Sequence, residues 1–292
     1  MDEREALAML ASELPGAGDD AAVIGDQVVT TDMLHETTDF PAGTTRYTAG
    51  WRAVGASLSD VAAMGARATA AVAAYGAPEL DREEIEAFVA GASDVCEAVD
   101  AAYVGGDLDG HEEFTVATTA LGDADDPVRR SGAQPGDAVC VTGTLGRSAA
   151  ALELFDDGKP ERANDLFRFE PRVAAGRALA PDATAMMDSS DGLARSLHQL
   201  AEASDCGVEI DGDAVPIDDA VAEVATDDAE RREMGLFFGE DFELVVAIPE
   251  DRLDAAIERC PTPLSRVGTV TGAGVEIDGE PLPDRGFTHG KE

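Results

Sequence analysis

The chain has 292 residues, 44% of them hydrophobic, which suits two packed domains and argues against intrinsic disorder. Its 60 acidic against 21 basic residues give a net charge of −39, which repels nucleic acid and anionic lipid and resembles adaptation to high salt. The apolar runs stop short of the roughly 20 residues that a membrane helix needs, and the acidic start MDEREALAML is unlike a secretory signal. We therefore expect a cytoplasmic protein without a membrane segment.

Hydrophobic periodicity predicts that helices and strands alternate in the first half of the chain. Trp51, Val54, Leu58 and Val61 follow one another at spacings of three and four residues, so one face of that helix should be core. The expected helices span residues 3–13, 47–64 and 81–99. One expected strand ends at residues 23–24, and the others span 27–31, 68–75, 101–104 and 115–121.

A polar stretch rich in Gly and Pro at residues 125–135 is the best candidate for a domain boundary. We therefore expect an α/β protein with domains at 1–134 and 135–292. In the second domain the pattern predicts strands at 138–142 and 244–248 and near residues 267 and 275, with helices at 147–155, 193–204 and 251–259.

Five clusters place a carboxylate beside Gly, Ser or Thr near the end of an apolar run. Backbone can approach a ligand at such places, and hydroxyl and carboxylate oxygens can share one ion. Magnesium prefers a few such hard oxygen ligands together with phosphate oxygens. Any one cluster alone is equally compatible with an ordinary turn, so only their conjunction indicates a metal site. The clusters are Gly18-Asp19-Asp20-Ala21-Ala22, Thr30-Thr31-Asp32, Leu58-Ser59-Asp60-Val61, Gly105-Gly106-Asp107 and Asp188-Ser189-Ser190-Asp191-Gly192.

The sequence lacks a Walker-type phosphate loop, a dinucleotide fingerprint and the protein-kinase motifs. Residues 143–146 join a strand to a helix and could present amides to phosphate, but a purely structural turn is the favoured interpretation. Arg130 could chelate phosphate with paired donors, with an interdomain salt bridge as the alternative.

Taken together, these segments resemble the thiamine-monophosphate kinase family, which shares a superfamily with aminoimidazole ribonucleotide synthetase and selenophosphate synthetase. The resemblance runs nearly end to end and is specific in order and spacing. It implies a two-domain α/β (α+β) fold of the aminoimidazole ribonucleotide synthetase type whose N-terminal sheet pairs with that of a second subunit. The segments that carry it are GDDAAVI, TTDML, LSDVAAMGA, GGD, RSGAQPGD, VTGTLG, DSSDGL, ASDCG and GEDFEL.

The resemblance also implies roles for individual residues. Asp32 and Asp191 are the expected catalytic residues, and Gly106, Asp107, Arg130 and Ser190 would contact ATP. Glu240 and Phe287 would meet the thiamine moiety, and Asp39 stands at the substrate-contacting position where the family usually has His. Several Mg2+ ions would be held by Asp20, Thr30, Thr31, Asp32, Asp60, Asp107, Asp188 and Asp191.

The reaction that this resemblance implies is direct transfer of the ATP γ-phosphoryl group to thiamine monophosphate, giving thiamine diphosphate. The acceptor phosphate is already ionised near neutral pH, so no general base is needed. One alternative is another ATP-dependent synthetase of the superfamily, acting in selenophosphate synthesis, hydrogenase maturation or purine synthesis. The other is a non-catalytic acidic protein whose aspartates only hold cations and water at the surface.

Overall fold

The computed structural model of the protein describes residues 9, 13–14 and 17–286. In this part of the chain five strands form an N-terminal sheet in the order β1-β2-β5-β3-β4. β3 and β4 are parallel and are joined by a helix, while the other neighbours are antiparallel. The strands are β1 (Ala22–Ile24), β2 (Gln27–His35), β3 (Arg67–Ala77), β4 (Ala102–Gly110) and β5 (Thr115–Asp123).

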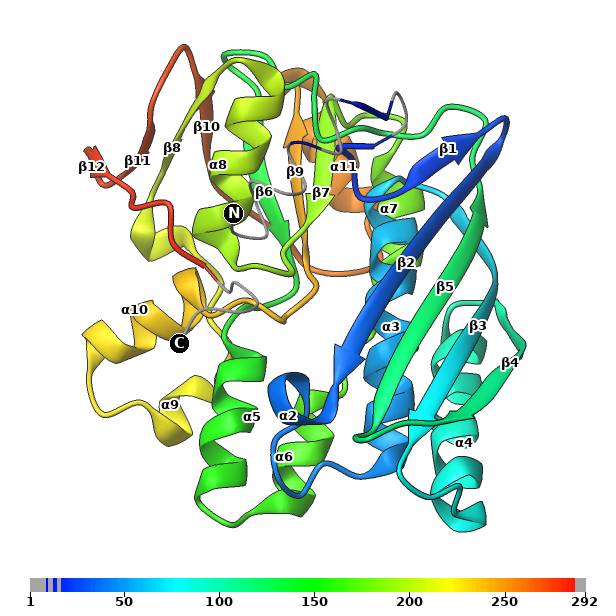
Figure 1. The fold of residues 1–292 in the computed structure, drawn as a ribbon. Helices are drawn as coiled ribbons and strands as arrows, with labels where there is room; N and C mark the ends of the chain where they lie inside the picture. The colour runs from blue at the N-terminus through cyan, green and yellow to red at the C-terminus, as the bar shows by residue number, and fades with distance from the viewer. Residues whose placement is uncertain (1–8, 10–12, 15–16, 287–292) are drawn as a thin grey trace.

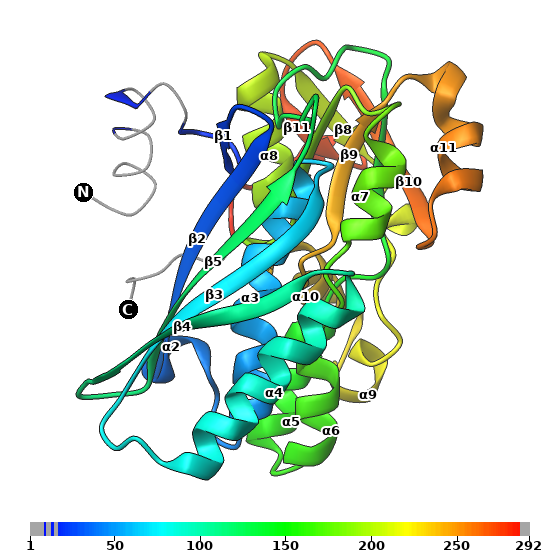
Figure 2. The same cartoon turned by 90° about the vertical axis from the view of Figure 1, so that its right-hand side faces the viewer.

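One face of the N-terminal sheet is covered by α3 (Arg46–Ala63) and α4 (Arg82–Ala98), and the other face, seen in Figure 2, carries no helix in the described chain. Thr45 caps α3 by accepting a hydrogen bond from the amide of Thr48. The predicted core stripe is confirmed for Val54, Leu58 and Val61, which are fully buried, whereas Trp51 is half-buried.

Two glycines allow α3 and α4 to pack backbone against backbone. A Cβ atom at Gly50 would lie 2.2 Å from the carbonyl oxygen of Phe88, and one at Gly91 would lie 1.9 Å from that of Tyr47. Larger residues would push the helices apart. The close approach fixes α3 tightly in the centre of the molecule (Figure 1).

Seven strands of the described chain form the C-terminal sheet in the order β12-β11-β8-β10-β6-β9-β7. β6 and β9 are interior strands of this sheet and are buried along their whole length, as expected for strands covered on both faces. The strands are β6 (Ala138–Thr142), β7 (Ala185–Asp188), β8 (Gly207–Ile210), β9 (Leu244–Ile248), β10 (Leu264–Thr271), β11 (Val275–Ile277) and β12 (Glu280–Pro281).

Helices lie on both sides of the C-terminal sheet (Figure 1). α8 packs on one face, whereas α7, α11 and the central α3 share a core with the other. Beyond α3 and α4, the helices are α2 (Glu36–Asp39), α5 (Arg147–Asp156), α6 (Pro160–Phe167), α7 (Val173–Leu179), α8 (Leu193–Ser204), α9 (Val221–Val224), α10 (Asp228–Phe237) and α11 (Leu253–Arg259), with short 3-10 turns at Gly212–Ala214 and Glu250–Arg252.

One hydrophobic core continues from the N-terminal half into the C-terminal sheet. Val54 and Leu58 of α3 belong to the same buried cluster as Cys140 of β6 and Val246 of β9. No described helix or strand lies between β5 and β6, where the sequence predicts a linker. The boundary at residue 134 stays a prediction, because the two halves are joined by packing as well as by the linker.

Most of the expected elements are present, with strands that run further than periodicity indicated. β2 continues to His35 and β4 to Gly110, through polar and glycine residues that the apolar pattern does not mark. The pattern did not predict α2, α6, α7, α9, α10, β7, β8 or β12, and the helix expected at 3–13 falls largely outside the described residues. Among the described residues, no helix has the length and apolar character to cross a membrane.

Candidate active site

Three buried carboxylates from distant parts of the sequence meet between the two sheets. One oxygen each of Asp20, Asp60 and Asp188 lies within 4.8 Å of the other two, close enough for all three to bind a single ion. Asp20 precedes β1, Asp60 lies on α3 and Asp188 ends β7. The structure therefore brings together residues of three predicted clusters, two from the N-terminal half and one from the C-terminal half.

The alternation of β2 determines which of its polar side chains face this cluster. Thr30 and Asp32 point towards α3, where Thr30 Oγ1 donates a hydrogen bond to Asp60 Oδ2 at 2.5 Å and Asp32 Oδ2 accepts one from Ser57 Oγ at 2.5 Å. Thr31 points to the opposite face and donates to the carbonyl oxygen of Thr118 at 2.8 Å. The structure thus does not bring the Thr31 side chain to the three carboxylates.

Burial and mutual repulsion raise the pKa values of these carboxyl groups. Burial raises the pKa of Asp188 from 3.8 to about 7, with a further contribution from Asp20. Burial, followed by the charges of Asp32, Asp188 and Asp20, raises the pKa of Asp60 well above its ordinary value. Burial also raises the pKa of Asp20 and Asp32. A divalent cation would relieve this repulsion and hold the groups ionised.

The oxygen atoms of the cluster are suited to such an ion. Asp20 Oδ2 is buried and makes no hydrogen bond to any residue that the structure describes. Arg130 provides positive charge nearby, with Nη2 at 3.1 Å from Asp20 Oδ1, and Arg129 and Arg130 both contact Asp19. One arginine beside three carboxylates leaves an excess of negative charge, which fits the hard divalent cation that the sequence predicts.

Ser190 and Asp191 lie in the turn between β7 and α8, directly after Asp188. The carbonyl oxygen of Ser190 accepts a hydrogen bond from the amide of Glu240 at 2.7 Å. A Cβ atom at Gly239, where φ is +86°, would lie 2.5 Å from the same oxygen. Main-chain contacts therefore hold the turn at Ser190, which is predicted to contact the nucleotide, against the segment at Glu240, which is predicted to contact the substrate.

Gly106 and Asp107 lie away from the three carboxylates, on the edge strand β4. Asp107 is level with Ala74 of β3, Ala117 of β5 and Met33 of β2. Three strand spacings separate β4 from β2, about 14 Å in total. A single chain thus does not gather the whole predicted ligand set, and Asp107 lies exposed at the edge of the uncovered sheet face.

A pocket of about 260 Å3 is lined by two of the three predicted substrate residues, Asp39 and Glu240. Its other walls include Phe40, Phe167 and Phe238. The hydrogen bond from the amide of Glu240 to the carbonyl oxygen of Ser190, two residues after Asp188, joins the pocket to the segment that carries the carboxylate cluster. Phe287 lies outside the described residues.

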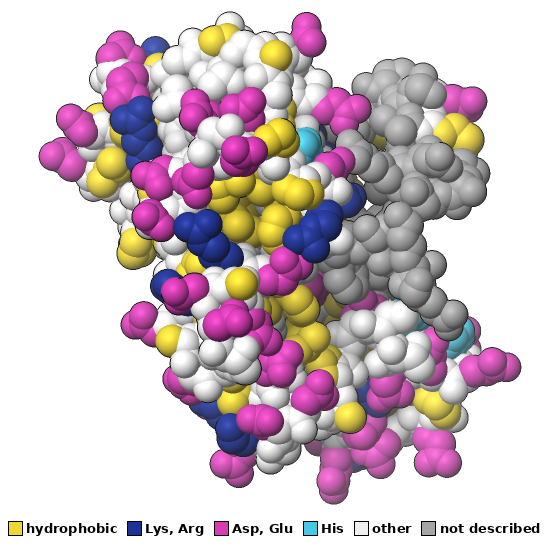
Figure 3. Space-filling view, turned by 90° about the vertical axis from the view of Figure 1, so that its left-hand side faces the viewer, with side chains coloured by type: hydrophobic (Ala, Val, Ile, Leu, Met, Phe, Trp, Pro, Cys, Tyr) yellow, Lys and Arg dark blue, Asp and Glu magenta, His cyan; other side chains and the backbone are white. Residues whose placement is uncertain are grey.

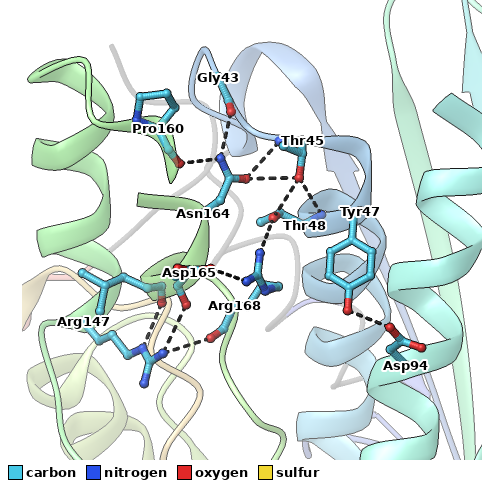
Figure 4. A network of polar contacts seen from close by, with 11 residues as sticks. Gly43, Thr45, Tyr47, Thr48, Asp94, Arg147, Pro160, Asn164, Asp165 and Arg168 are labelled. Carbon is cyan, nitrogen blue, oxygen red and sulfur yellow. Dashed lines mark hydrogen bonds and ion pairs between the residues drawn. The ribbon is translucent and has the colours of Figure 1, made fainter. Parts of the chain in front are cut away.

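Buried Asn164 of α6 holds the loop that follows the pocket wall (Figure 4). Its Nδ2 donates to the carbonyl oxygen of Gly43 at 2.9 Å, and its Oδ1 accepts from the amide of Thr45 at 3.0 Å. Gly43 and Thr45 follow Phe40 and Pro41, which line the pocket. A polar link between the two halves thus anchors this wall.

The N-terminus of α5 is occupied by a side chain that the sequence did not single out. Asp241 accepts hydrogen bonds from the amides of Gly146 at 2.5 Å and Ser148 at 2.9 Å. These amides are therefore not open to phosphate, which favours the structural interpretation of residues 143–146. Arg52 was also missed, because it lies on a helix whose periodicity indicated only core, and Ser59 belonged to a predicted cluster but was given no role of its own.

Comparisons with known proteins identify the family of this chain. The models for the N-terminal and C-terminal domains of AIR synthase related proteins match residues 18–124 and 134–279. A thiamine-monophosphate kinase of Halobacterium salinarum is 66% identical over 99% of this chain and 100% of its own length. The chain belongs to the thiamine-monophosphate kinase family.

Other members of the thiamine-monophosphate kinase family are more distant in sequence but cover the chain equally well. The enzyme of Methanospirillum hungatei is 41% identical over 99% of both chains. The structure of AaThiL complexed with AMPPCP and TMP aligns with a TM-score of 0.89 at 27% identity, covering 99% of this chain and 97% of that one. Family membership and the two-domain fold are thus confirmed.

Proposed function

We propose that this protein transfers the terminal phosphoryl group of ATP to thiamine monophosphate and so makes thiamine diphosphate. Membership of the thiamine-monophosphate kinase family supports this activity. The structural observation that carries the proposal is the meeting of Asp20, Asp60 and Asp188, together with the main-chain hydrogen bond that joins Glu240 of the acceptor pocket to Ser190. Sites for a metal-bound polyphosphate and for a cationic acceptor would then be neighbours.

Asp20, Asp60 and Asp188, with Asp32 nearby, would hold Mg2+ in this mechanism. When bound, the ions supply positive charge that lowers the repulsion between the two phosphate-bearing substrates and stabilises the transferring group. The side chains of Thr30, Ser57 and Ser59 fix the carboxylates by donating hydrogen bonds to Asp60, Asp32 and Asp188. We assign Arg130, Ser190 and Asp191 to the nucleotide end of the site, with Asp191 also a metal ligand.

The acceptor end combines negative charge with aromatic surface. Asp39 and Glu240 suit a cationic thiazolium, and Phe40, Phe167 and Phe238 supply rings against which a flat ligand can pack. The acceptor oxygen belongs to an ionised phosphate, so the residues need only to position it in line with the donor.

A homodimer would complete the site. The exposed face and edges of the N-terminal sheet carry large apolar side chains, among them Met33, Leu108 and Ile24, which are 58%, 50% and 65% exposed. Such a surface is typical of an interface. Because Asp107 lies about three strand spacings from β2 in its own chain, we infer that it serves the carboxylate cluster of a second copy.

The burial of the cluster argues against a protein whose aspartates only hold surface water. The side chains of Asp20 and Asp188 are 3% and 2% exposed, where a purely solvating residue would be open to water. Many other acidic side chains do cover the surface (Figure 3), and we assign to these the proposed adaptation to high salt.

A direct assay tests the proposed function. Purified protein is incubated with ATP, thiamine monophosphate and Mg2+ in concentrated KCl, and thiamine diphosphate is measured by fluorescence after oxidation to its thiochrome. Product should form only when all three are present. An Asp32→Asn/Asp191→Asn double variant should lose activity by about 100-fold or more. Absence of product with the wild-type protein, or full activity of the folded double variant, would overturn the proposal.

A further inference from the structure

Arg52 is a buried cation that joins the central helix to the acceptor pocket. Its side chain is 3% exposed and lies on α3, in the N-terminal half. Nη1 donates to the carbonyl oxygen of Phe167 at 2.6 Å and to Ser148 Oγ at 3.3 Å, and Nη2 donates to Glu240 Oε2 at 2.5 Å. All of these acceptors belong to the C-terminal half of the chain.

The guanidinium also contacts the aromatic wall of the same pocket. It lies 3.6 Å from the ring centroid of Phe167, which lines the pocket together with Glu240. Planar stacking and directed hydrogen bonds require the shape of an arginine rather than a point charge. Arg52 thus contacts two pocket residues at once and fixes their separation.

The segment that carries Glu240 has an unusual backbone. Gly239, Glu240 and Phe242 have φ values of +86°, +62° and +55°. For the two residues that are not glycine, such conformations are strained and need support from the surrounding structure. They are retained because the flanking side chains are anchored: Asp241 at the start of α5, and Glu243 by two hydrogen bonds from Arg172 at 2.7 and 2.5 Å.

The charges around the pocket add up to a small negative value. Asp39, Asp156 and Glu240 line the pocket and contribute three negative charges, and Arg52 contributes one positive charge. Burial lowers the pKa of Arg52, while the charges of Glu240, Asp241 and Asp39 oppose that effect. With Arg52 in place, the three lining carboxylates and the guanidinium leave two net negative charges, which favours a cationic ligand.

We propose that Arg52 is a positioning residue for the phosphoryl acceptor: it holds the Glu240 carboxylate in the pocket, where the carboxylate can meet a cationic ring. This inference rests on the proposed function. Without Arg52, the Glu240 carboxylate would face Asp39 and Asp32 with no partner to hold it, and would bind the acceptor poorly. ATP binding, which uses other residues, would be unaffected.

The test compares steady-state kinetics of Arg52→Met, Arg52→Lys, Glu240→Gln and the Arg52→Met/Glu240→Gln double variant. Arg52→Met should raise KM for thiamine monophosphate about tenfold or more and leave KM for ATP within about twofold. Arg52→Lys should recover part of that loss. The double variant should be no worse than Glu240→Gln alone, because Arg52 acts through Glu240.

Arg147→Met is the matched control. Arg147 likewise donates to main-chain oxygens of the segment around Phe167, namely those of Asp165, Leu166 and Arg168, but makes no hydrogen bond to Glu240 among the described residues (Figure 4). Its variant should melt at a lower temperature with KM for thiamine monophosphate unchanged.

If Arg52→Met fails to fold, Ser148→Ala is tested in its place. Ser148 Oγ accepts a hydrogen bond from Arg52 Nη1 at 3.3 Å and donates one to the carbonyl oxygen of Glu240 at 2.5 Å. This variant should raise KM for thiamine monophosphate in the same direction. Equal increases in KM for ATP, or additive losses in the double variant, would overturn the inference and leave the proposed function intact. An inactive wild-type protein would instead overturn the proposed function.

Discussion

Ser59 Oγ donates a hydrogen bond to Asp188 Oδ2 at 2.7 Å, although the two residues are 129 positions apart in the sequence. Ser59 lies on α3 and Asp188 at the end of β7, so this bond joins the two halves of the chain at the carboxylate cluster. The packing of α3 against the C-terminal sheet is therefore what assembles the site. Mutations that loosen this packing should weaken metal binding even where no ligand is changed.

The pKa shift of Asp188 predicts how the stability of the metal-free protein depends on pH. Burial raises this pKa from 3.8 to about 7, so the folded state binds the proton more tightly than the unfolded state. The stability that this proton contributes is present below the unfolded value and is lost as pH rises towards 7. Thermal melting in EDTA should therefore show a midpoint that falls between about pH 4 and pH 7, the window between the unfolded and folded pKa values.

The matched variant for that experiment is Asp188→Asn, which carries no titratable group. Its melting midpoint should fall less steeply with pH, and added Mg2+ should stabilise the wild-type protein more than the variant at pH 8. Identical slopes for both proteins would mean that the cluster does not titrate as described.

The capping of α5 predicts a cost in stability for Asp241→Ala. Removing the carboxylate leaves the amides of Gly146 and Ser148 buried without an acceptor, which costs about 1–3 kcal/mol. Asp241→Asn retains an oxygen acceptor and should cost less. Urea unfolding of the three proteins at constant salt measures the difference, and an alanine variant as stable as wild type would contradict the role of Asp241.

If the uncovered face of the N-terminal sheet forms the proposed dimer interface, Met33→Glu should dissociate the dimer. Met33 is 58% exposed on β2, and a buried glutamate in an apolar interface has no partner to offset its desolvation. Analytical ultracentrifugation should show a dimer for wild type and a monomer for the variant, with greatly reduced activity. Leu80→Glu, at a 51% exposed position outside the strands, is the control and should remain dimeric.

The net charge of −39 predicts that salt stabilises the fold. Repulsion among surface carboxylates is screened over a Debye length of about 10 Å at 0.1 M salt and about 3 Å at 1 M. The melting temperature should therefore rise between 0.1 M and 2 M KCl. The stabilisation that comes from neutralising the buried carboxylate cluster should instead depend mostly on Mg2+. A midpoint that is independent of KCl would show that surface repulsion is unimportant.

The sequence alone could predict the central helix, the two halves and the clusters to which the metal ligands belong. Trp51 to Val61 have a clear helical period, and Asp20, Asp60 and Asp188 each stand beside small residues at the end of an element. The distances between them could not be predicted, because they depend on how α3 packs against β7. The separation of Asp107 from the cluster depends on strand order, which local pattern does not determine.

The roles of Arg52, Ser59 and Asp241 could not be found by pattern for a different reason. Arg52 and Ser59 lie among apolar residues on a helix where periodicity indicates core, and their polar partners are 96 or more residues away in sequence. Asp241 is one of 60 acidic residues, so its type carries no signal. The tertiary contacts alone distinguish these residues from their neighbours.

The most direct test of the central claim is binding of Mn2+, as a spectroscopic substitute for Mg2+, in the presence of a non-hydrolysable ATP analogue. Electron paramagnetic resonance measures free Mn2+ during titration of the wild-type protein and of an Asp60→Asn/Asp188→Asn double variant in concentrated KCl. We predict tight, analogue-dependent binding by the wild-type protein and loss of that binding in the folded variant. Equal binding by both proteins would contradict the assignment of the buried carboxylates as metal ligands.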